Sequence, residues 1–327
     1  MAMLGEEHVG HNEAEITDRL ITAINRASLR RYPEGEVKRF NQAKGLGCFS
    51  ADFAIERNLP EELQQGLFKS GQVYAARIRF ANASETDDSK KDFRGMSIKL
   101  TGVKGKSLWG ADGTQDFLLN SYPALFAATP ADFLSFVEAA ADDATWKYFI
   151  NPWHLYSLLI VLRGRARIAS PFDIRYWSTT PYRFGDSDTV AVKYSVKPCS
   201  SIRSEEPDGP SGDYLAAAMK THLKKAEACF DFMVQFQTDP KAMPVEDASV
   251  VWDEGIAPVR KLATITIKDQ EFQTATARQQ CERMSFNPWQ SLAEHRPIGG
   301  INRVRRAIYA ETAQFRGEEN RKRGLIE

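Results

Sequence analysis

The sequence predicts an α+β fold built around an antiparallel sheet or barrel. Five segments alternate apolar and polar residues, a pattern typical of strands that bury one face. These segments cover residues 73–80, 96–100, 190–196, 230–236 and 263–267. Helical periodicity gathers elsewhere, in residues 129–163, near 213–228 and after Ile301. The connections between the alternating segments vary in length, which favours antiparallel pairing over a doubly wound parallel sheet.

The first expected element is a helix near the N-terminus. Apolar residues recur at helical spacing after Thr17, whose short hydroxyl side chain suits an N-cap. These apolar residues are Leu20, Ile24 and Ala27. The polar residues 1–12 are expected to form a flexible tail. No linker rich in glycine, proline and serine divides the rest of the chain, so residues 13–327 are predicted to form a single domain.

The middle of the chain is predicted to contain further helices. Thr129-Pro130 opens one of them, because proline in the first turn lacks an N–H that the helix leaves unpaired anyway. Residues 151–162 (NPWHLYSLLIVL) form a strongly apolar stretch. We interpret this stretch as a packed core helix. The alternative is that it lines an apolar entrance to a site.

The composition argues against several classes of function. The 327 residues include 43 Lys and Arg against 43 Asp and Glu, so a formal net charge of zero gives no case for nucleic acid or an anionic membrane. No run of about 18 apolar residues is present, and membrane insertion is therefore not expected. The acidic first 20 residues contain no apolar segment typical of a signal peptide.

The cysteines are predicted to be reduced. They lie far apart in the chain, and none has the CxxC or CxxH spacing of a zinc site. The cysteines are Cys48, Cys199, Cys229 and Cys281. This pattern favours free thiols over a disulfide framework, and free thiols are typical of the cytosol. The sequence therefore predicts a cytoplasmic protein.

Two arginines share one face of the alternating segment 73–80. Arg77 and Arg79 lie opposite the apolar residues of that segment. If the apolar face packs against the core, both guanidinium groups face solvent. The alternative is that they line a pocket for an anionic ligand, because the planar guanidinium binds carboxylates and phosphates in bidentate fashion.

A tyrosine lies between two arginines on the predicted C-terminal helix. Arg305, Tyr309 and Arg316 fall on one stripe of the segment GINRVRRAIYAETAQFR. Such a tyrosine is either a core residue with a satisfied hydroxyl or an iron ligand. Phenolate binds ferric iron, and a guanidinium one turn away favours the ionised phenol.

Several segments, in the same order along the chain, are similar to motifs of the catalases. The matching segments are IRFANAS (78–84), DFRGMSIKL (92–100), DFLLNSYPALF (116–126), FNPWQSLAEHRPIGG (286–300) and the helix with Arg305, Tyr309 and Arg316. The matches extend from about Arg39 to Arg316. The chain does not contain the long N-terminal arm and C-terminal extension of familiar catalases, so it resembles the small catalase-related haemoproteins of that superfamily.

The resemblance implies the catalase core, an antiparallel β-barrel of about eight strands surrounded by helices, with haem b as cofactor. Tyr309 would be the axial iron ligand, and Arg305 would keep it ionised. Arg39, Arg79 and Arg316 would pair with the haem propionates. On the distal side, Asn120 matches the asparagine that hydrogen-bonds peroxide, and Phe133 matches a phenylalanine near the haem.

The distal histidine of the catalases is absent. The family motif R-V-V-H-A-[RK]-G corresponds here to Arg39-Phe40-Asn41-Gln42-Ala43-Lys44-Gly45, which places Gln42 at the histidine position. The serine that supports this histidine in the family corresponds to Ala81. Glutamine forms hydrogen bonds but does not titrate, so it cannot act as a general base. Loss of general acid–base help typically costs about 10² to 10⁴ in rate.

The sequence therefore predicts a haem-dependent peroxidase that acts on peroxides, with weak activity on hydrogen peroxide. Organic hydroperoxides of the fatty-acid type are favoured, because an apolar tail can position the O–O bond by binding energy. One alternative is a haem enzyme of non-redox chemistry, such as a hydroperoxide isomerase, lyase or dehydratase. Another is a haem-binding sensor without turnover. The expected partners are a small-molecule hydroperoxide and further copies of the chain, as a homodimer or higher oligomer.

Overall fold

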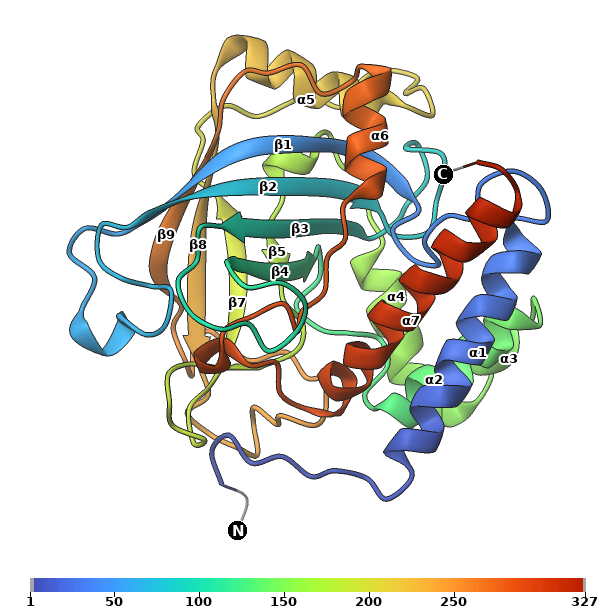
Figure 1. Cartoon of the computed structure of the whole chain (residues 1–327), viewed down its shortest axis with the longest axis horizontal. Helices are drawn as coiled ribbons and strands as arrows, with labels where there is room; N and C mark the ends of the chain where they lie inside the picture. The colour runs from blue at the N-terminus through green and yellow to red at the C-terminus, as the bar shows by residue number, and fades with distance from the viewer. Residues whose placement is uncertain (1–2, 326–327) are drawn as a thin grey trace.

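The computed structural model describes residues 3–325 and confirms an antiparallel β-barrel with surrounding helices (Figure 1). Its strands are β1 (Lys44–Ile55), β2 (Val73–Asn82), β3 (Arg94–Thr101), β4 (Thr114–Asn120), β5 (Tyr176–Trp177), β6 (Tyr182–Arg183), β7 (Ala191–Pro198), β8 (Ala228–Phe236) and β9 (Arg260–Ile267). The order β5-β4-β3-β2-β1-β9-β8-β7 closes into a ring because β5 also pairs with β7, and β6 adds to β7. This ring matches the eight strands that the resemblance implies.

The strands that the sequence predicts are those that bury one face. β2 and β8 alternate buried and more exposed residues over much of their length, as the apolar pattern indicates. β4 was not predicted, because residues 115–119 are buried on both faces and show no alternation. β1 contains two glycines and a register shift between Gly45 and Gly47, which also hides its pattern.

Aromatic side chains fill the barrel. Phe117 of β4 packs edge-to-face on Phe232 of β8, with ring centroids 4.8 Å apart, and on Tyr194 of β7 at 5.1 Å. Phe53 of β1 packs on Phe232 as well, at 5.1 Å. Because these strands lie on different sides of the ring, the barrel interior is a packed core. A ligand site must therefore lie outside it.

The helices form a second layer beside the barrel. They are α1 (Glu13–Arg31), α2 (Pro130–Ala141), α3 (Thr145–Phe149), α4 (Leu155–Gly164), α5 (Tyr214–Lys225), α6 (Ala275–Arg283) and α7 (Gly300–Lys322). α1 and α7 run side by side, and α2 packs on both to form a separate apolar cluster (Figure 1). α6 lies across the ends of β1 and β2.

The predicted start of α2 is confirmed, and the predicted N-cap of α1 is wrong. Thr129 caps α2 by accepting a hydrogen bond from the Asp132 backbone N–H at 3.2 Å. Thr17 does not cap α1, which begins at Glu13, and its hydroxyl donates to the Glu13 carbonyl at 2.8 Å. Acidic residues in the first turn complement the positive end of the helix dipole, which explains the earlier start.

Part of the predicted N-terminal tail contacts the domain. The Gly5 N–H donates to Gln237 Oε1 at 2.7 Å, and the Glu7 carboxylate pairs with Arg296 at 2.6 Å. The His8 N–H donates to Glu246 Oε1 at 2.8 Å. Polar residues of this stretch therefore form specific contacts with residues far along the chain.

The prediction of reduced cysteines is wrong for the described residues, in which the four cysteines form two disulfides. Cys199 and Cys229 come together because β7 and β8 are neighbours, and the Cys199 N–H donates to the Cys229 carbonyl. Cys48 of β1 is joined to Cys281 of α6, 233 residues away in sequence. Disulfides are typical of oxidising compartments, so the pairing does not support the cytoplasmic expectation.

The interpretation of residues 151–162 as a packed core helix is also wrong. Trp153 is 90% exposed, and Leu155, Tyr156, Leu159 and Leu162 are all exposed. Within residues 3–325, no helix is both long enough and apolar enough to cross a membrane.

Candidate active site

Helix α7 brings Arg305, Tyr309 and Arg316 to the side of the barrel. Its apolar stripe packs on α1 and α2, and its first turn is anchored by Asn302. The Asn302 side-chain amide donates to the Pro181 carbonyl at 2.8 Å, and the Trp289 indole donates to the Asn302 carbonyl at 2.6 Å. These contacts fix how far α7 stands from the barrel.

Arg305 and Tyr309 form a direct pair, as their spacing predicts. One guanidinium nitrogen of Arg305 (Nη2) donates to the Tyr309 hydroxyl at 2.9 Å, and the guanidinium lies 5.2 Å from the centre of the ring. Arg305 Nη1 donates to Asn302 Oδ1 at 3.2 Å, which orients the guanidinium. The phenol oxygen of Tyr309 therefore accepts a charge-assisted hydrogen bond from a partly buried cation.

The two arginines of β2 have opposite environments. Arg77 is exposed and donates to Ser50 Oγ at 2.6 Å. Arg79 is only 2% exposed, because the Gln42 backbone and the end of α6 cover it. The solvent-facing interpretation therefore holds for Arg77 and fails for Arg79.

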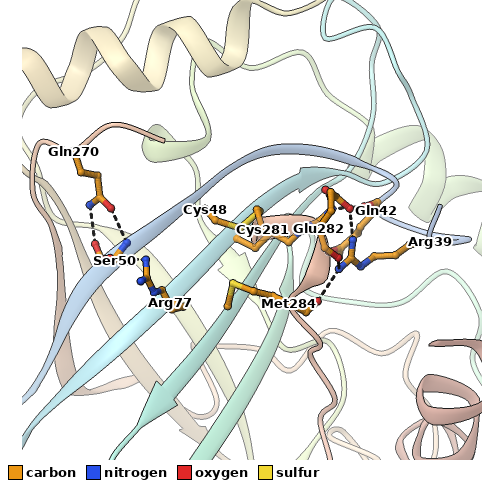
Figure 2. The surroundings of a disulfide bond; sticks show 10 residues. Arg39, Gln42, Cys48, Ser50, Arg77, Gln270, Cys281, Glu282 and Met284 are labelled. Carbon is orange, nitrogen blue, oxygen red and sulfur yellow. Dashed lines mark hydrogen bonds and ion pairs between the residues drawn. A yellow bond between two sulfur atoms is a disulfide. The ribbon is translucent and has the colours of Figure 1, made fainter. Parts of the chain in front are cut away.

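Arg39 and Arg79 converge on one carboxylate, that of Glu282. Arg79 Nη2 lies 3.4 Å from Glu282 Oε1, and Arg39 Nη1 pairs with Glu282 Oε2. Arg39 also donates to the carbonyls of Glu282 and Met284, at 3.0 and 2.7 Å (Figure 2). The Cys48–Cys281 disulfide lies directly beside this cluster and ties the residue before Glu282 to β1.

The cluster has more positive than negative charge. Burial, and then the charge of Arg39, lower the pKa of Arg79 to about 10, and the same causes lower the pKa of Arg316 to about 10. Among the described residues, Glu282 is the carboxylate that contacts Arg39 and Arg79. It also lies near enough to Arg316 to act on its charge, as does Glu36, which is exposed. Two positive charges remain unbalanced.

This excess of charge fits a group with two carboxylates. The buried Arg79 Nε atom has no hydrogen-bond partner among the described residues, which leaves a donor for an incoming anion. Buried unpaired charge is costly, and a bound dianion would balance it. The donor set therefore fits the two propionates of haem b, with the Tyr309 hydroxyl on the same helix as Arg316.

Gln42 and Asn120 come together over β3. A Cβ atom at Gly95 would lie 2.2 Å from the Gln42 side-chain nitrogen, so Gln42 rests directly on this glycine. Gly95 pairs with Asn120 on one side and with Ala81 on the other. Three of the positions that the resemblance assigns to the distal side, Gln42, Ala81 and Asn120, thus surround Gly95. Gln42 also has a φ of 59°, an uncommon backbone conformation for a residue with a side chain.

Phe133 of α2 and Tyr309 of α7 pack against the same helical apolar cluster. Each is partly buried there. The catalytic and cofactor-binding roles of all the predicted residues stay predictions.

Sequence reasoning missed Glu282 and Gly95. Glu282 lies more than 200 residues from both arginines, and α6 has too few apolar residues to predict a helix. Gly95 belongs to a matched motif, but its function as a seat for Gln42 depends on a close approach that only the folded chain creates.

Comparison with known proteins places this geometry in context. No family model matches the sequence. Catalase T of Saccharomyces cerevisiae is 24% identical over 280 residues, which cover 79% of this chain and 48% of the relative. A peroxisomal catalase of Toxoplasma gondii is 22% identical over 283 residues, covering 78% of this chain and 54% of the relative. The chain thus spans about half the length of these curated relatives.

The solved structures that resemble this fold are catalases as well. Catalase A from Saccharomyces cerevisiae superposes with a TM-score of 0.69 at 18% identity, covering 97% of this chain and 67% of that structure. A fungal catalase crystal structure gives a TM-score of 0.69 at 18% identity, covering 88% of this chain and 60% of the other. The sequence relatives and the fold agree: this chain is similar in sequence to catalases and has the fold of the solved catalases.

Proposed function

We propose that this protein is a haem-dependent oxidoreductase that acts on peroxides, with haem b as its cofactor. The observation that carries the proposal is the unbalanced arginine cluster of Arg39, Arg79 and Arg316, of which Arg316 lies on the same helix as the Arg305–Tyr309 pair. A dianionic macrocycle with a ferric centre satisfies both features at once. The catalase relatives support the same cofactor.

Each residue of the site has a defined task in this proposal. Arg39, Arg79 and Arg316 would hold the propionates, and Tyr309 would bind the iron. Arg305 donates a hydrogen bond to the phenol oxygen and would stabilise the negative charge of an iron-bound oxygen there. When bound, haem would supply the iron chemistry of peroxide cleavage.

The distal residues determine the preferred peroxide. Gln42 can orient a peroxide by hydrogen bonds, together with Asn120, but it cannot take up and return a proton. Hydrogen peroxide depends fully on such proton transfer, whereas an organic hydroperoxide is also positioned by its apolar part. We therefore place fatty-acid-type hydroperoxides ahead of hydrogen peroxide as substrates.

The test of the cofactor is a visible spectrum of the full chain titrated with haem. We expect stoichiometric binding and a ferric high-spin spectrum of the tyrosinate type, which Tyr309→Phe abolishes. Tyr156→Phe, at an exposed tyrosine of α4, is the matched control and should leave the spectrum unchanged. A protein that binds no haem, or a Tyr309→Phe spectrum identical to the wild type, would overturn the proposal.

The test of the substrate class compares turnover of hydrogen peroxide and of a fatty-acid hydroperoxide. Gln42→His should raise hydrogen peroxide cleavage by about 10² or more, because it restores a titrating base. Asn41→His is the matched control, since this neighbouring side chain is exposed and does not rest on Gly95. Fast hydrogen peroxide turnover by the wild type would contradict the assignment. Formation of a rearranged product without use of a reductant would indicate an isomerase or lyase.

A further inference from the structure

Helices α3 and α4 present a large apolar face to solvent. Seven large apolar side chains between residues 146 and 162, on α3, α4 and the segment that joins them, are 45% to 90% exposed. They are Trp146, Ile150, Trp153, Leu155, Tyr156, Leu159 and Leu162. We call this surface the α3–α4 face. α3 lies at the outer margin of the helical layer, away from the barrel (Figure 1). Contiguous exposed apolar surface of this kind marks an interaction site.

The distribution of polar and apolar residues on helix α4 is the reverse of that on an ordinary surface helix. Ser157 and Gly164 lie on its buried side with Ile160, while the large apolar residues point outward. Gly164 is required there, because a Cβ atom would lie 2.1 Å from the Phe93 ring. An ordinary surface helix buries its apolar stripe and exposes its polar one. The outward apolar side of α4 therefore needs a partner of its own.

A polar network holds this face in place. The Tyr148 hydroxyl donates to Asp132 Oδ1 at 2.7 Å, and it lies 3.2 Å from Ser157 Oγ. The His154 ring stacks on Tyr148 at 3.8 Å and lies 3.1 Å from the Asp132 carboxylate. Because these contacts join α2, α3 and α4, the apolar side chains cannot turn inward without breaking them.

The charge of the face is positive, although the whole chain is neutral. Residues 144–172 contain no Asp or Glu, but they include Lys147 and Arg163. Within residues 3–325 neither of these two forms an ion pair, whereas Arg165 and Arg167 pair with Glu85 and Glu206. On the N-terminal side Asp142 is paired with Arg26, and Asp143 is exposed, so the face has two unpaired cations beside one carboxylate.

We propose that the α3–α4 face binds the surface of a lipid bilayer with anionic headgroups. Tryptophan and tyrosine prefer the boundary between headgroups and acyl chains, and free lysine and arginine are drawn to anionic lipids. A second copy of this chain fits less well, because a twofold interface would bring Lys147 and Arg163 against the same charges of the partner. The proposal does not depend on haem.

The experiment is co-sedimentation of the full chain with vesicles of phosphatidylcholine, with and without phosphatidylserine. We expect binding that phosphatidylserine strengthens and salt weakens. Trp153→Ser with Leu162→Ser should weaken it by about tenfold or more, because less apolar surface is buried. Val73→Ser with Ile256→Ser removes exposed apolar residues elsewhere and should have no effect.

The charge contribution has its own matched pair of variants. Lys147→Gln with Arg163→Gln should reduce only the part of binding that phosphatidylserine adds, whereas Lys104→Gln with Lys106→Gln, at exposed lysines far from the face, should not. Absence of vesicle binding by the wild type, or equal losses in face and control variants, would overturn the proposal. So would a dimer that the Trp153 and Leu162 changes dissociate without lipid, which would make the face a chain–chain interface.

Discussion

The two ends of helix α7 contain arginine clusters of opposite character. At the N-terminal end, Arg303 contacts the carboxylates of Glu7, Glu13 and Glu246 at 2.8 to 2.9 Å. These hydrogen bonds outweigh the effect of burial and raise the pKa of Arg303. Toward the C-terminal end, Arg316 lies near Arg39, which shares the Glu282 carboxylate with Arg79, and burial and the charge of Arg39 lower the pKa of Arg316 instead.

The difference separates a structural cluster from a binding cluster. The carboxylates around Arg303 also accept the Gly299 and Gly300 amides at the start of α7, so the whole group is satisfied within the chain. The cluster of Arg39, Arg79 and Arg316 is not satisfied, and Arg79 retains a buried unpaired donor. An arginine cluster that its own chain leaves short of negative charge is a place for an anionic ligand.

The largest expected effect is a loss of stability at the N-terminal end. Arg303→Met should lower the free energy of unfolding by about 3 kcal/mol, because it leaves three carboxylates close together without their cation. Chemical denaturation measures this loss, and a haem titration of the same variant should match the wild type. A stable variant, or one with a selective haem defect, would remove the distinction between the two clusters.

Arg79→Met should weaken haem binding and leave the stability of the fold nearly unchanged. We expect haem affinity to fall about 10- to 100-fold, since charge-assisted hydrogen bonds are worth about 1.5–3 kcal/mol. The free energy of unfolding should change by less than about 1 kcal/mol, because an incompletely balanced buried charge is removed with its partner bonds. Arg77→Met is the matched control on the same strand and should alter neither quantity, given its exposed side chain.

How much of this molecule the sequence can predict depends on the range of the contacts involved. β2 and β8 were predicted because burial of one face leaves an alternation in the sequence. β4 is buried on both faces and leaves none, and α6 buries only Cys281. The resemblance to catalases supplied the barrel, which periodicity alone could not distinguish from an open sheet.

The same limit applies to the site. Arg305 and Tyr309 are one helical turn apart, so their pairing follows from local spacing. The contact of Arg79 with Glu282 and the Cys48–Cys281 bond join residues about 200 or more positions apart, and no local pattern indicates them. The disulfides show that separation along the chain is weak evidence for free thiols.

A smaller effect is expected from Glu282→Gln, which makes the binding cluster still more positive. Haem affinity should rise up to about tenfold, or about 1.4 kcal/mol, because a competing carboxylate next to Arg39 and Arg79 is lost. Haem dimethyl ester, which has no free carboxylates, should bind equally to both proteins. Glu271→Gln, an exposed carboxylate in the preceding loop, is the control variant. Weaker haem binding would mean that Glu282 organises the arginines more than it competes for them.

The smallest expected effect is a loss of stability at low pH, which should involve the Arg303 cluster and not the cluster of Arg39, Arg79 and Arg316. Burial raises the pKa of Glu7, but the hydrogen bonds from the Gly299 amide, Arg296 and Arg303 outweigh it, so the pKa lies below its ordinary 4.5. A lowered folded-state pKa means that Glu7 stabilises the fold above pH 4.5 and that this stability is lost as the pH falls through the folded-state pKa. Unfolding midpoints of wild type and Glu7→Gln should therefore differ at pH 7 and converge as the pH falls below 4.5.

Arg79 and Arg316 keep their charge throughout this range, because even their lowered pKa values are about 10. A difference between the two proteins that stays constant with pH would show that Glu7 acts by packing rather than by its charge.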